Sequence, residues 1–191
     1  MNLIQLSAPS GTKEISITES NSDTRIEICD FFEGQEDKNL NDFTLIVNVD
    51  KNCENANVTI FARYEARLKQ RKFFTLSVYL NGKHQTANID VRGIADDSSV
   101  LRFNGGGIVT KESDQCSVSI IQKIHLFSVQ AKAQAIPVLR VETENVLSAS
   151  HSASISPFSK DIYFYMETRG ISKQDIKKIL RQGLLFPNDK V

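Results

Sequence analysis

The feature that most constrains this chain is a long series of short segments in which apolar and polar residues alternate. Between Gly11 and about Pro157 these segments are separated by polar or glycine-containing breaks, and few stretches are long enough for a helix. Successive side chains on a strand point to opposite faces, so each segment can bury one face and leave the other in water. The sequence therefore predicts a mostly β body.

The clearest predicted strands carry β-branched or aromatic residues at alternate positions. They span residues 43–49, 57–62, 73–80 and 87–92, and weaker candidates follow at 100–103, 116–121, 124–128 and 138–141. Their centres lie roughly 10–15 residues apart, a spacing that sandwiches, barrels and β-helices share. The run Asn104-Gly105-Gly106-Gly107 has no following G-K-[ST], so it predicts a bend between strands and not a phosphate loop.

Length and charge narrow the class of protein. The chain has 191 residues, enough for one domain with a core that needs neither disulfides nor a structural metal. Its 23 Lys+Arg balance 23 Asp+Glu, so no net positive field favours nucleic acid or an anionic membrane. The first residues carry no basic, apolar leader pattern, and no apolar run approaches the roughly 18 residues of a membrane span. We therefore expect a cytoplasmic protein.

The three cysteines favour neither a disulfide framework nor a zinc ribbon. Cys29, Cys53 and Cys116 are odd in number, widely spaced, and form no C-x-x-C pair. We expect Cys29 and Cys116 to be small buried residues and Cys53 to lie exposed in a turn. Thiolates are also good ligands for iron–sulfur clusters, so cluster binding by these residues stays an alternative.

After Pro157 the pattern changes from strands to helices, which divides the chain into a β body, residues 1–157, and a helical hairpin with tail, residues 158–191. Ser159 and Ser172 are predicted helix N-caps, and Asp175 completes a capping-box-like pair with Ser172. Gly170 is predicted to end the first helix and Gly183 to cap the second. The apolar residues 184–187 should dock on the β body or on another protein.

The C-terminal stretch from Ile136 to Leu185 resembles the SufB/SufD family, the scaffold proteins of the SUF iron–sulfur cluster assembly system. Order and spacing agree over its motifs, and a weaker similarity reaches back to about Leu76. The segments that carry the resemblance are Pro137-Val138-Leu139-Arg140-Val141, Ser150-His151-Ser152-Ala153-Ser154-Ile155, Asp161-Ile162-Tyr163-Phe164-Tyr165-Met166-Glu167-Thr168-Arg169-Gly170-Ile171-Ser172 and Ile179-Leu180-Arg181-Gln182-Gly183-Leu184.

The resemblance implies a right-handed parallel β-helix that ends in a short helical hairpin. It further implies a non-catalytic scaffold that partners a SufC-like ABC ATPase and pairs with a SufB/SufD-like subunit or with itself. An iron–sulfur cluster would be held transiently, with His151 as the candidate ligand, since neutral imidazole binds iron. Candidate partner-binding residues in the hairpin are Arg169, Gly170, Lys173, Lys177 and Arg181.

The chain also departs from the family pattern. Many family members have a cysteine where this chain has Ala149, and a Gly or Glu where it has Ser152. Members are usually much longer, with helices on both sides of this region, so we expect an incomplete ATPase-docking surface. Two alternatives stay open: a β-helix interaction module that binds no cluster, and a carbohydrate-active enzyme. The enzyme would need a groove that gathers carboxylates such as Asp90, Asp96, Asp97 and Glu112.

Overall fold

The structure, a computed structural model, describes residues 1–32 and 40–186. These residues form eleven strands and two helices. The elements in chain order are β1 (Asn2–Ser7), β2 (Gly11–Ile17), β3 (Asp23–Asp30), β4 (Leu40–Val49), β5 (Asn57–Ala66), β6 (Arg71–Leu80), β7 (Thr86–Ala95), β8 (Val100–Val109), β9 (Cys116–Leu126), β10 (Lys132–Val141), β11 (Val146–Pro157), α1 (Lys160–Glu167) and α2 (Lys173–Leu185).

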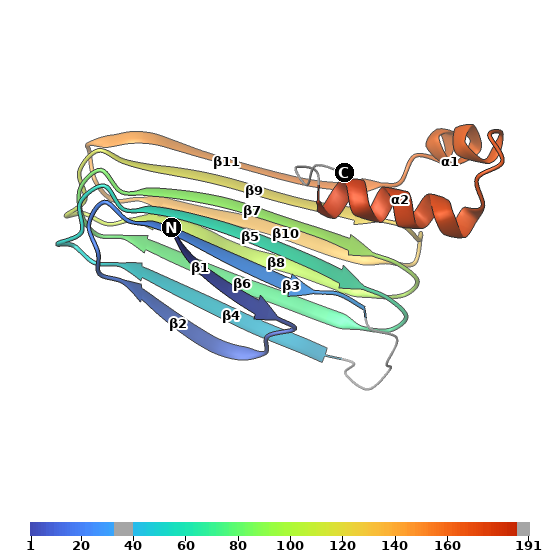
Figure 1. The fold of residues 1–191 in the computed structure, drawn as a ribbon, viewed down its shortest axis with the longest axis horizontal. Helices are drawn as coiled ribbons and strands as arrows, with labels where there is room; N and C mark the ends of the chain where they lie inside the picture. The colour runs from blue at the N-terminus through green and yellow to red at the C-terminus, as the bar shows by residue number, and fades with distance from the viewer. Residues whose placement is uncertain (33–39, 187–191) are drawn as a thin grey trace.

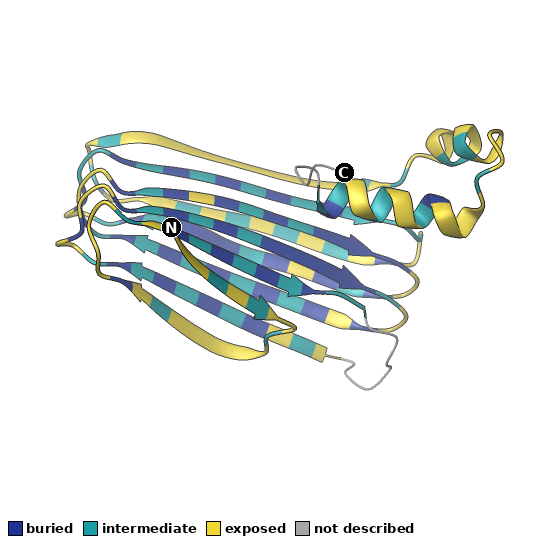
Figure 2. Ribbon diagram, viewed as in Figure 1, coloured by how far each residue is buried: buried dark blue, intermediate teal, exposed yellow. Residues whose placement is uncertain are grey.

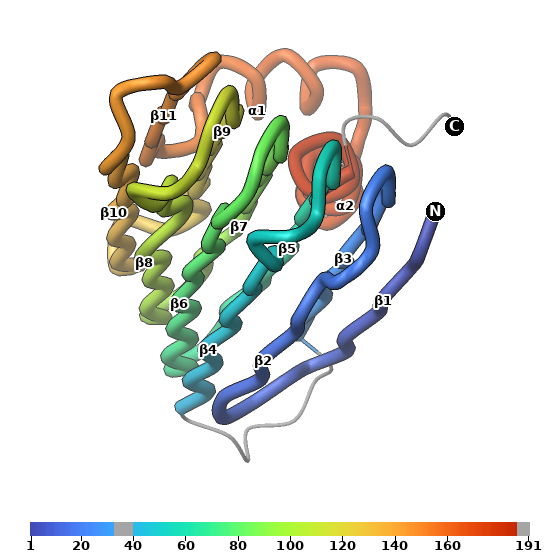
Figure 3. Tube along the Cα trace, turned by 90° about the vertical axis from the view of Figure 1, so that its left-hand side faces the viewer, coloured from blue at the N-terminus to red at the C-terminus, as the bar shows by residue number. Residues whose placement is uncertain are grey.

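The strands coil into a parallel β-solenoid of about five turns, which confirms the predicted β-helix (Figure 1). One sheet contains the odd-numbered strands in the order β1-β3-β5-β7-β9-β11, and the other contains the even-numbered strands in the order β2-β4-β6-β8-β10. An end-on view shows the two sheets as facing layers (Figure 3). Each turn therefore adds one strand to each sheet.

The core consists of rows of similar side chains stacked along the solenoid, because in-register parallel strands place equivalent residues above one another. Phe43, Phe74 and Phe103 form one such row in the even sheet. The Phe43 and Phe74 rings stack with their centroids 5.9 Å apart, and Tyr64 from the odd sheet lies 5.3 Å from Phe74. All four rings are buried, and each buried ring contributes on the order of 1.5–3 kcal/mol. These aromatic residues fill the middle turns.

One row in the odd sheet consists of isoleucines from five consecutive strands and ends in a histidine. The register pairs each member with the next, from β1 to β11. The members of this isoleucine row are Ile4, Ile26, Ile60, Ile89, Ile120 and His151.

The turns between the sheets contain a stacked position that is occupied by a histidine, His84, in one turn. Asn21, Asn55, His84 and Gln115 occupy equivalent places in successive turns, each with φ between 51° and 56°. Asn and His tolerate this left-handed conformation better than most residues. His84 therefore has a structural position in a stacked turn.

Some predicted strand boundaries were wrong. The sequence predicted two strands at 116–121 and 124–128, but the single strand β9 covers 116–126. The triple glycine lies inside β8 and not in a bend between strands. Gly105 has φ +98°, and a Cβ built there would collide with the Leu76 carbonyl oxygen on β6. Glycine is required there by backbone packing, and no phosphate loop forms.

The helical hairpin begins as the sequence predicts. The Ser159 side chain accepts a hydrogen bond from the Asp161 N–H, and the Ser172 side chain accepts one from the Asp175 N–H at 3.2 Å. Gly170, with φ +79°, follows the C-cap of α1. Gly183 does not cap α2, because the helix continues through it to Leu185. Tertiary contacts made by the last turn explain this extension past a glycine.

Helix α2 lies on the outer side of the odd-numbered sheet, whereas α1 extends beyond the end of the strands (Figures 1 and 3). Ile176 and Leu185 of α2 are fully buried, and the Phe186 ring packs edge-on against Phe31 with centroids 5.6 Å apart. The predicted docking of the apolar tail on the β body is confirmed for Leu185 and Phe186. Pro187 lies outside the described residues.

Candidate functional site

His151 lies at the open C-terminal end of the solenoid. It occupies the inward face of β11, in register with Ile120 of β9, and thus continues the isoleucine row. Ile120 is 1% exposed, whereas His151 is exposed because no strand stacks on β11 in the part of the chain that the structure describes. The imidazole therefore stands where the interior of the solenoid opens to solvent.

Around His151 the inward residues of the last two strands are mostly small. We call this surface the terminal face; it comprises Ala133, Ala135 and Leu139 of β10 together with Ala149, His151 and Ala153 of β11. The β10 members are half-buried and pack on the core. Figure 2 shows β11 exposed along nearly its whole length, next to the largely buried strands of the middle turns. The terminal face is thus a flat opening lined by small side chains.

The terminal face is bordered by two long sheet edges. β10 and β11 are the last strands of their sheets among the described residues, and they contain ten and twelve residues. Unpaired backbone N–H and C=O groups on such edges are templates for strand pairing with another chain. Exposed apolar side chains accompany them, with Val138 at 40%, Leu147 at 66% and Ile155 at 43%.

The cysteines do not form a thiolate site. Cys116 is buried as expected, whereas Cys29 is only partly buried, and Cys53 is buried at 1% exposed. The predicted burial of Cys29 and the predicted exposure of Cys53 were therefore wrong. Burial raises the pKa of the Cys29, Cys53 and Cys116 thiols. The described ranges contain no group of three or more His, Cys, Asp or Glu side chains that could hold a metal ion.

The structure divides the five candidate partner-binding residues of the hairpin into two groups. Lys177 and Arg181 face the β body, where they pair with buried carboxylates: Lys177 Nζ lies 2.5 Å from Asp96, and an Arg181 guanidinium nitrogen lies 2.8 Å from Glu65. Arg169, Gly170 and Lys173 lie at the exposed turn between the helices. The Arg169 guanidinium stacks over the Tyr165 ring at 4.6 Å, and Lys173 is 3.6 Å from Glu167.

The hairpin also presents apolar side chains to solvent. Tyr163 packs edge-on against Phe158 with centroids 5.2 Å apart, which anchors α1 near the end of β11. Phe164 is 69% exposed, and Ile162, Tyr165 and Ile179 are each roughly half exposed. None of the α1 residues is buried. The hairpin thus has one face held to the solenoid through α2 and an apolar surface left uncovered.

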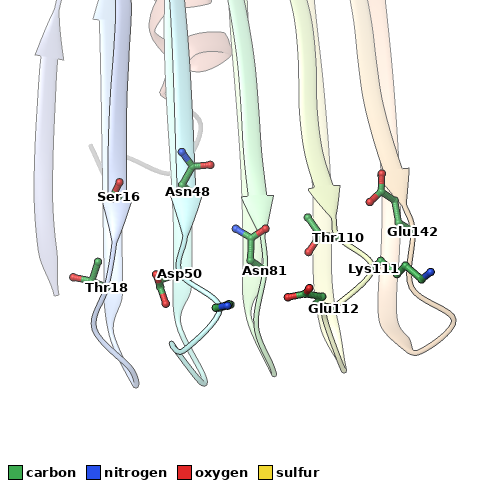
Figure 4. A pocket seen from close by; sticks show the side chains of 10 residues that line it. Ser16, Thr18, Asn48, Asp50, Asn81, Thr110, Lys111, Glu112 and Glu142 are labelled. Atoms are coloured by element: carbon green, nitrogen blue, oxygen red, sulfur yellow. The ribbon is translucent and has the colours of Figure 1, made fainter.

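The carboxylates considered for an enzyme do not share a groove. Asp90 is paired with Arg63 and Arg92 on the outer face of the odd sheet, and Asp96 is paired with Lys177. Glu112 instead lines an open groove of about 510 Å³ across the ends of the even-numbered strands (Figure 4). The other groove residues are Ser16, Thr18, Asn48, Asp50, Lys51, Asn81, Thr110, Lys111 and Glu142. Asp90, Asp96 and Asp97 do not line this groove with Glu112, so these four residues do not form the expected cluster of carboxylates.

Among the described residues, neither helix has the length and apolar character needed to cross a membrane.

These features define a class: a parallel β-solenoid with an open, histidine-bearing end and a helical hairpin docked on its side. The family model for the SUF system FeS cluster assembly SufBD core domain matches residues 38–184, which is more than half of the chain. The chain therefore belongs to the SufBD family, and the resemblance found in the C-terminal motifs is confirmed.

Curated relatives agree with this assignment. The chain is 26% identical over 121 residues to the iron–sulfur cluster assembly protein SufD of Bacillus subtilis, which covers 63% of this chain and 28% of that protein. It is 26% identical over 104 residues to an iron–sulfur cluster assembly SufBD family protein of Synechocystis sp., covering 54% of this chain and 23% of the relative. The chain thus spans about a quarter of the length of these relatives. A role in iron–sulfur cluster assembly is supported by this membership.

The sequence predicted His151 as a site residue but did not predict the terminal face around it. The terminal face depends on β11, whose outward positions are serines and whose inward positions include two alanines and His151, so apolar alternation was too weak to predict a strand. The available signal was the alternation itself: Ser148, Ser150, Ser152, Ser154 and Ser156 recur with period two.

Proposed function

We propose that this chain is a scaffold subunit in iron–sulfur cluster assembly that pairs through its terminal face and presents its hairpin to a SufC-like ABC ATPase. The observation that carries the proposal is the position of His151 at the open end of the isoleucine row, exposed where every preceding member of the row is apolar. A histidine there contributes little to packing. Its place between two unpaired sheet edges instead suits a ligand shared across a subunit interface.

The pairing partner in this proposal is a second copy of the chain or a SufB/SufD-like subunit. Edge-to-edge pairing along β10 and β11 would continue both sheets across the interface and cover the terminal face. It would also bury His151 with the small residues around it. The cluster is the cargo of the assembly, and the partner supplies further ligands, since Cys53 and Cys116 are buried away from solvent.

The ATPase in this proposal binds the uncovered side of the hairpin. Phe164, Tyr165 and the turn residues Arg169, Gly170 and Lys173 form that side, while Lys177 and Arg181 hold α2 to the β body. The same two basic residues therefore orient the docking surface without being free to contact the partner. ATP hydrolysis takes place in the ATPase, so the scaffold itself is non-catalytic, and the assembly is cytoplasmic.

The first test is anaerobic affinity purification from the native host, with mass spectrometry of bound proteins and a visible absorption spectrum of the eluate. Recovery of an ABC-type ATPase supports the proposal, and brown colour adds cluster binding. His151→Ala should remove bound iron while the ATPase is still recovered. The matched control is Ser152→Ala, the next residue on the opposite face of β11.

A second variant pair tests the hairpin. Phe164→Glu places a charge on the most exposed aromatic residue of α1, and it should abolish ATPase recovery without loss of folding. Lys160→Glu, at the exposed start of the same helix, is the control and should leave recovery intact. If neither ATPase nor iron is recovered with the wild-type chain, the proposal fails.

The second candidate function is an interaction module that pairs and docks but binds no cluster. The absence of a metal-binding group among the described residues favours it. Under this alternative the ATPase is recovered, the eluate is colourless, and His151→Ala has no effect on either result.

A further inference from the structure

Gln122 is a buried polar residue close to the terminal face that the fold alone does not explain. It lies on the inward face of β9 and is 2% exposed. Its row along the odd sheet otherwise contains Leu6, Ile28, Ala62, Val91 and Ala153. An aliphatic side chain would fit the pattern of that row, so the amide needs a reason of its own.

The amide nitrogen of Gln122 has a hydrogen-bond partner. Its Nε2 donates to the Gly105 carbonyl oxygen at 3.0 Å, across the interior of the solenoid. This hydrogen bond fixes the direction in which the amide points.

The amide oxygen of Gln122 is unpaired. Gln122 Oε1 is buried and has no hydrogen-bond partner among the described residues. An unpaired buried carbonyl destabilises the fold, so a retained one calls for an explanation. Because the amide is held by Gly105, Oε1 cannot turn away to find a donor elsewhere without breaking that bond.

The register places the His151 ring, a possible donor, diagonally from Gln122. Gln122 pairs with Ala153 of β11, and His151 lies two residues earlier on the same inward face. Ala153 is small, so it leaves space above Gln122 for the neighbouring side chain. In the isoleucine row and the Gln122 row, the two polar members are thus diagonal neighbours on adjacent strands.

We infer that Gln122 is a positioning residue for His151, whose ring N–H it receives at its unpaired Oε1. A neutral imidazole has one N–H donor and one nitrogen with a free lone pair. When one nitrogen donates to Gln122, the tautomer is fixed and the other nitrogen is left free as a ligand toward the open end. Histidines that bind metals are commonly oriented by such an acceptor.

The inference deepens the proposed function, which supplies the role of His151, but its test requires no iron. The ring nitrogens of the 191-residue chain are observed by ¹H–¹⁵N NMR at pH 8. Wild-type His151 should show one dominant tautomer. Gln122→Met, which removes the acceptor, should change the tautomer ratio about fivefold. Gln122→Leu also removes the acceptor and should change the ratio to the same extent.

Two controls accompany the measurement: the other histidines of the same chain, and a variant away from the interior. His84 and His125 lie outside the terminal face and should keep their signals in both variants. Gln134→Met, on the exposed side of β10, removes an amide without touching the interior and should leave His151 unchanged. A purely structural Gln122 would alter thermal stability in Gln122→Met while leaving the His151 tautomer ratio as in the wild type.

The inference is overturned if the two tautomers of His151 are about equally populated in the wild-type chain. It is also overturned if folded Gln122→Met has the wild-type tautomer ratio. If Gln122→Met does not fold, the wild-type spectrum and the spectrum of Gln122→Leu decide the question. A fixed tautomer together with iron recovery that is indifferent to His151→Ala would uphold the positioning role and refute the proposed function. If iron recovery depends on His151 but neither tautomer of its ring dominates, the proposed function is supported and the positioning role of Gln122 is refuted.

Discussion

The two ends of the solenoid differ in strand length and in the charge of their inward faces. At the N-terminal end β1 and β2 contain six and seven residues, and Lys13 occupies a row that continues as buried Leu45 and Leu76. At the C-terminal end β10 and β11 contain ten and twelve residues. The inward residues there are small or apolar apart from His151.

Under the proposed function, this difference distinguishes the two ends of the described solenoid as pairing surfaces. Short edge strands and inward-pointing charges are known protections against edge-to-edge association. The N-terminal end has both, whereas the terminal face has neither. Pro137 removes one donor from β10, but the proline of β11 is its last residue, so the longer edge is intact. The contrast favours association through the C-terminal end.

The largest expected effect concerns the isoleucine row that connects the two ends. Ile60→Ala, in a middle turn, should cost about 2–5 kcal/mol of unfolding free energy, because it leaves a cavity in a filled core. Ile4→Ala, at the half-buried N-terminal end, should cost about 1 kcal/mol. His151→Ala should cost no more than about 1 kcal/mol, the loss of its hydrogen bond to Gln122, because the exposed ring adds little packing. Urea unfolding of the three variants measures this gradient.

A large loss of stability in monomeric His151→Ala would contradict the comparison. The histidine would then be part of the packing, and its exposed position would no longer point to an interface. Equal losses of unfolding free energy in Ile4→Ala and Ile60→Ala would show that the N-terminal end is covered in solution.

The second prediction transfers the N-terminal protection to the C-terminal end. Ala135→Lys places an inward charge on β10, as Lys13 does on β2. It should weaken pairing about 100-fold or more, because like charges and a desolvated ammonium at an interface cost several kcal/mol. The wild-type chain should sediment as a dimer at micromolar concentration, and the variant as a 21.4 kDa monomer. Gln134→Lys, on the opposite face of β10, is the control. A monomeric wild type would refute self-pairing.

The third prediction removes the N-terminal protection. Lys13→Ile continues the apolar row to the first turn, so that both ends can associate and species larger than a dimer should form. The added contact should be weak, with a Kd on the order of 100 μM or weaker, since the short strands bury less than the roughly 1,200 Å² of a stable interface. Light scattering over a concentration series measures it, with Glu14→Ile on the outward face as control. Unchanged size for Lys13→Ile would show that strand length alone protects this end.

Much of the fold could be predicted from the sequence because its strands follow one simple rule. Stacked rows such as Phe43, Phe74 and Phe103 appear in the chain as alternating apolar residues, and the Ser159 and Ser172 caps mark the helices. The residues alone could not distinguish a solenoid from a sandwich, because strand pairing is a long-range property. That choice came from the family resemblance.

The candidate site was less predictable for physical reasons. His151 was found through its motif, but its exposure depends on which strand ends the stack. Lys177 and Arg181 look like free basic residues in the sequence, yet the docking of α2 places them against Asp96 and Glu65. Gln122 carried no signal, because one polar residue in a strand becomes informative only when its neighbours in space are known.

The smallest expected effect concerns how firmly β11 is held at the C-terminal end. The Ser156 hydroxyl lies 3.0 Å from His125 Nδ1 and links β11 to β9. Burial lowers the pKa of His125 below its usual 6.5, helped by the nearby charges of Lys123 and Arg92. Between the folded pKa and 6.5 the unfolded ring therefore binds more protons than the folded one. Stability should be complete above pH 6.5 and should fall as the pH drops through that window.

Since the ring is half-exposed, we expect a decrease in Tm of only about 1–2 °C between pH 7 and pH 5 from this group. His125→Gln should remove that part of the pH dependence, whereas His84→Gln should retain it. Amide exchange in β11 should accelerate at the lower pH before exchange in β9 does, because β11 has a neighbour on one side only. Equal acceleration in β9 and β11 would mean that the last strand is as firmly held as the core, and an open end that firm would need no partner to complete it.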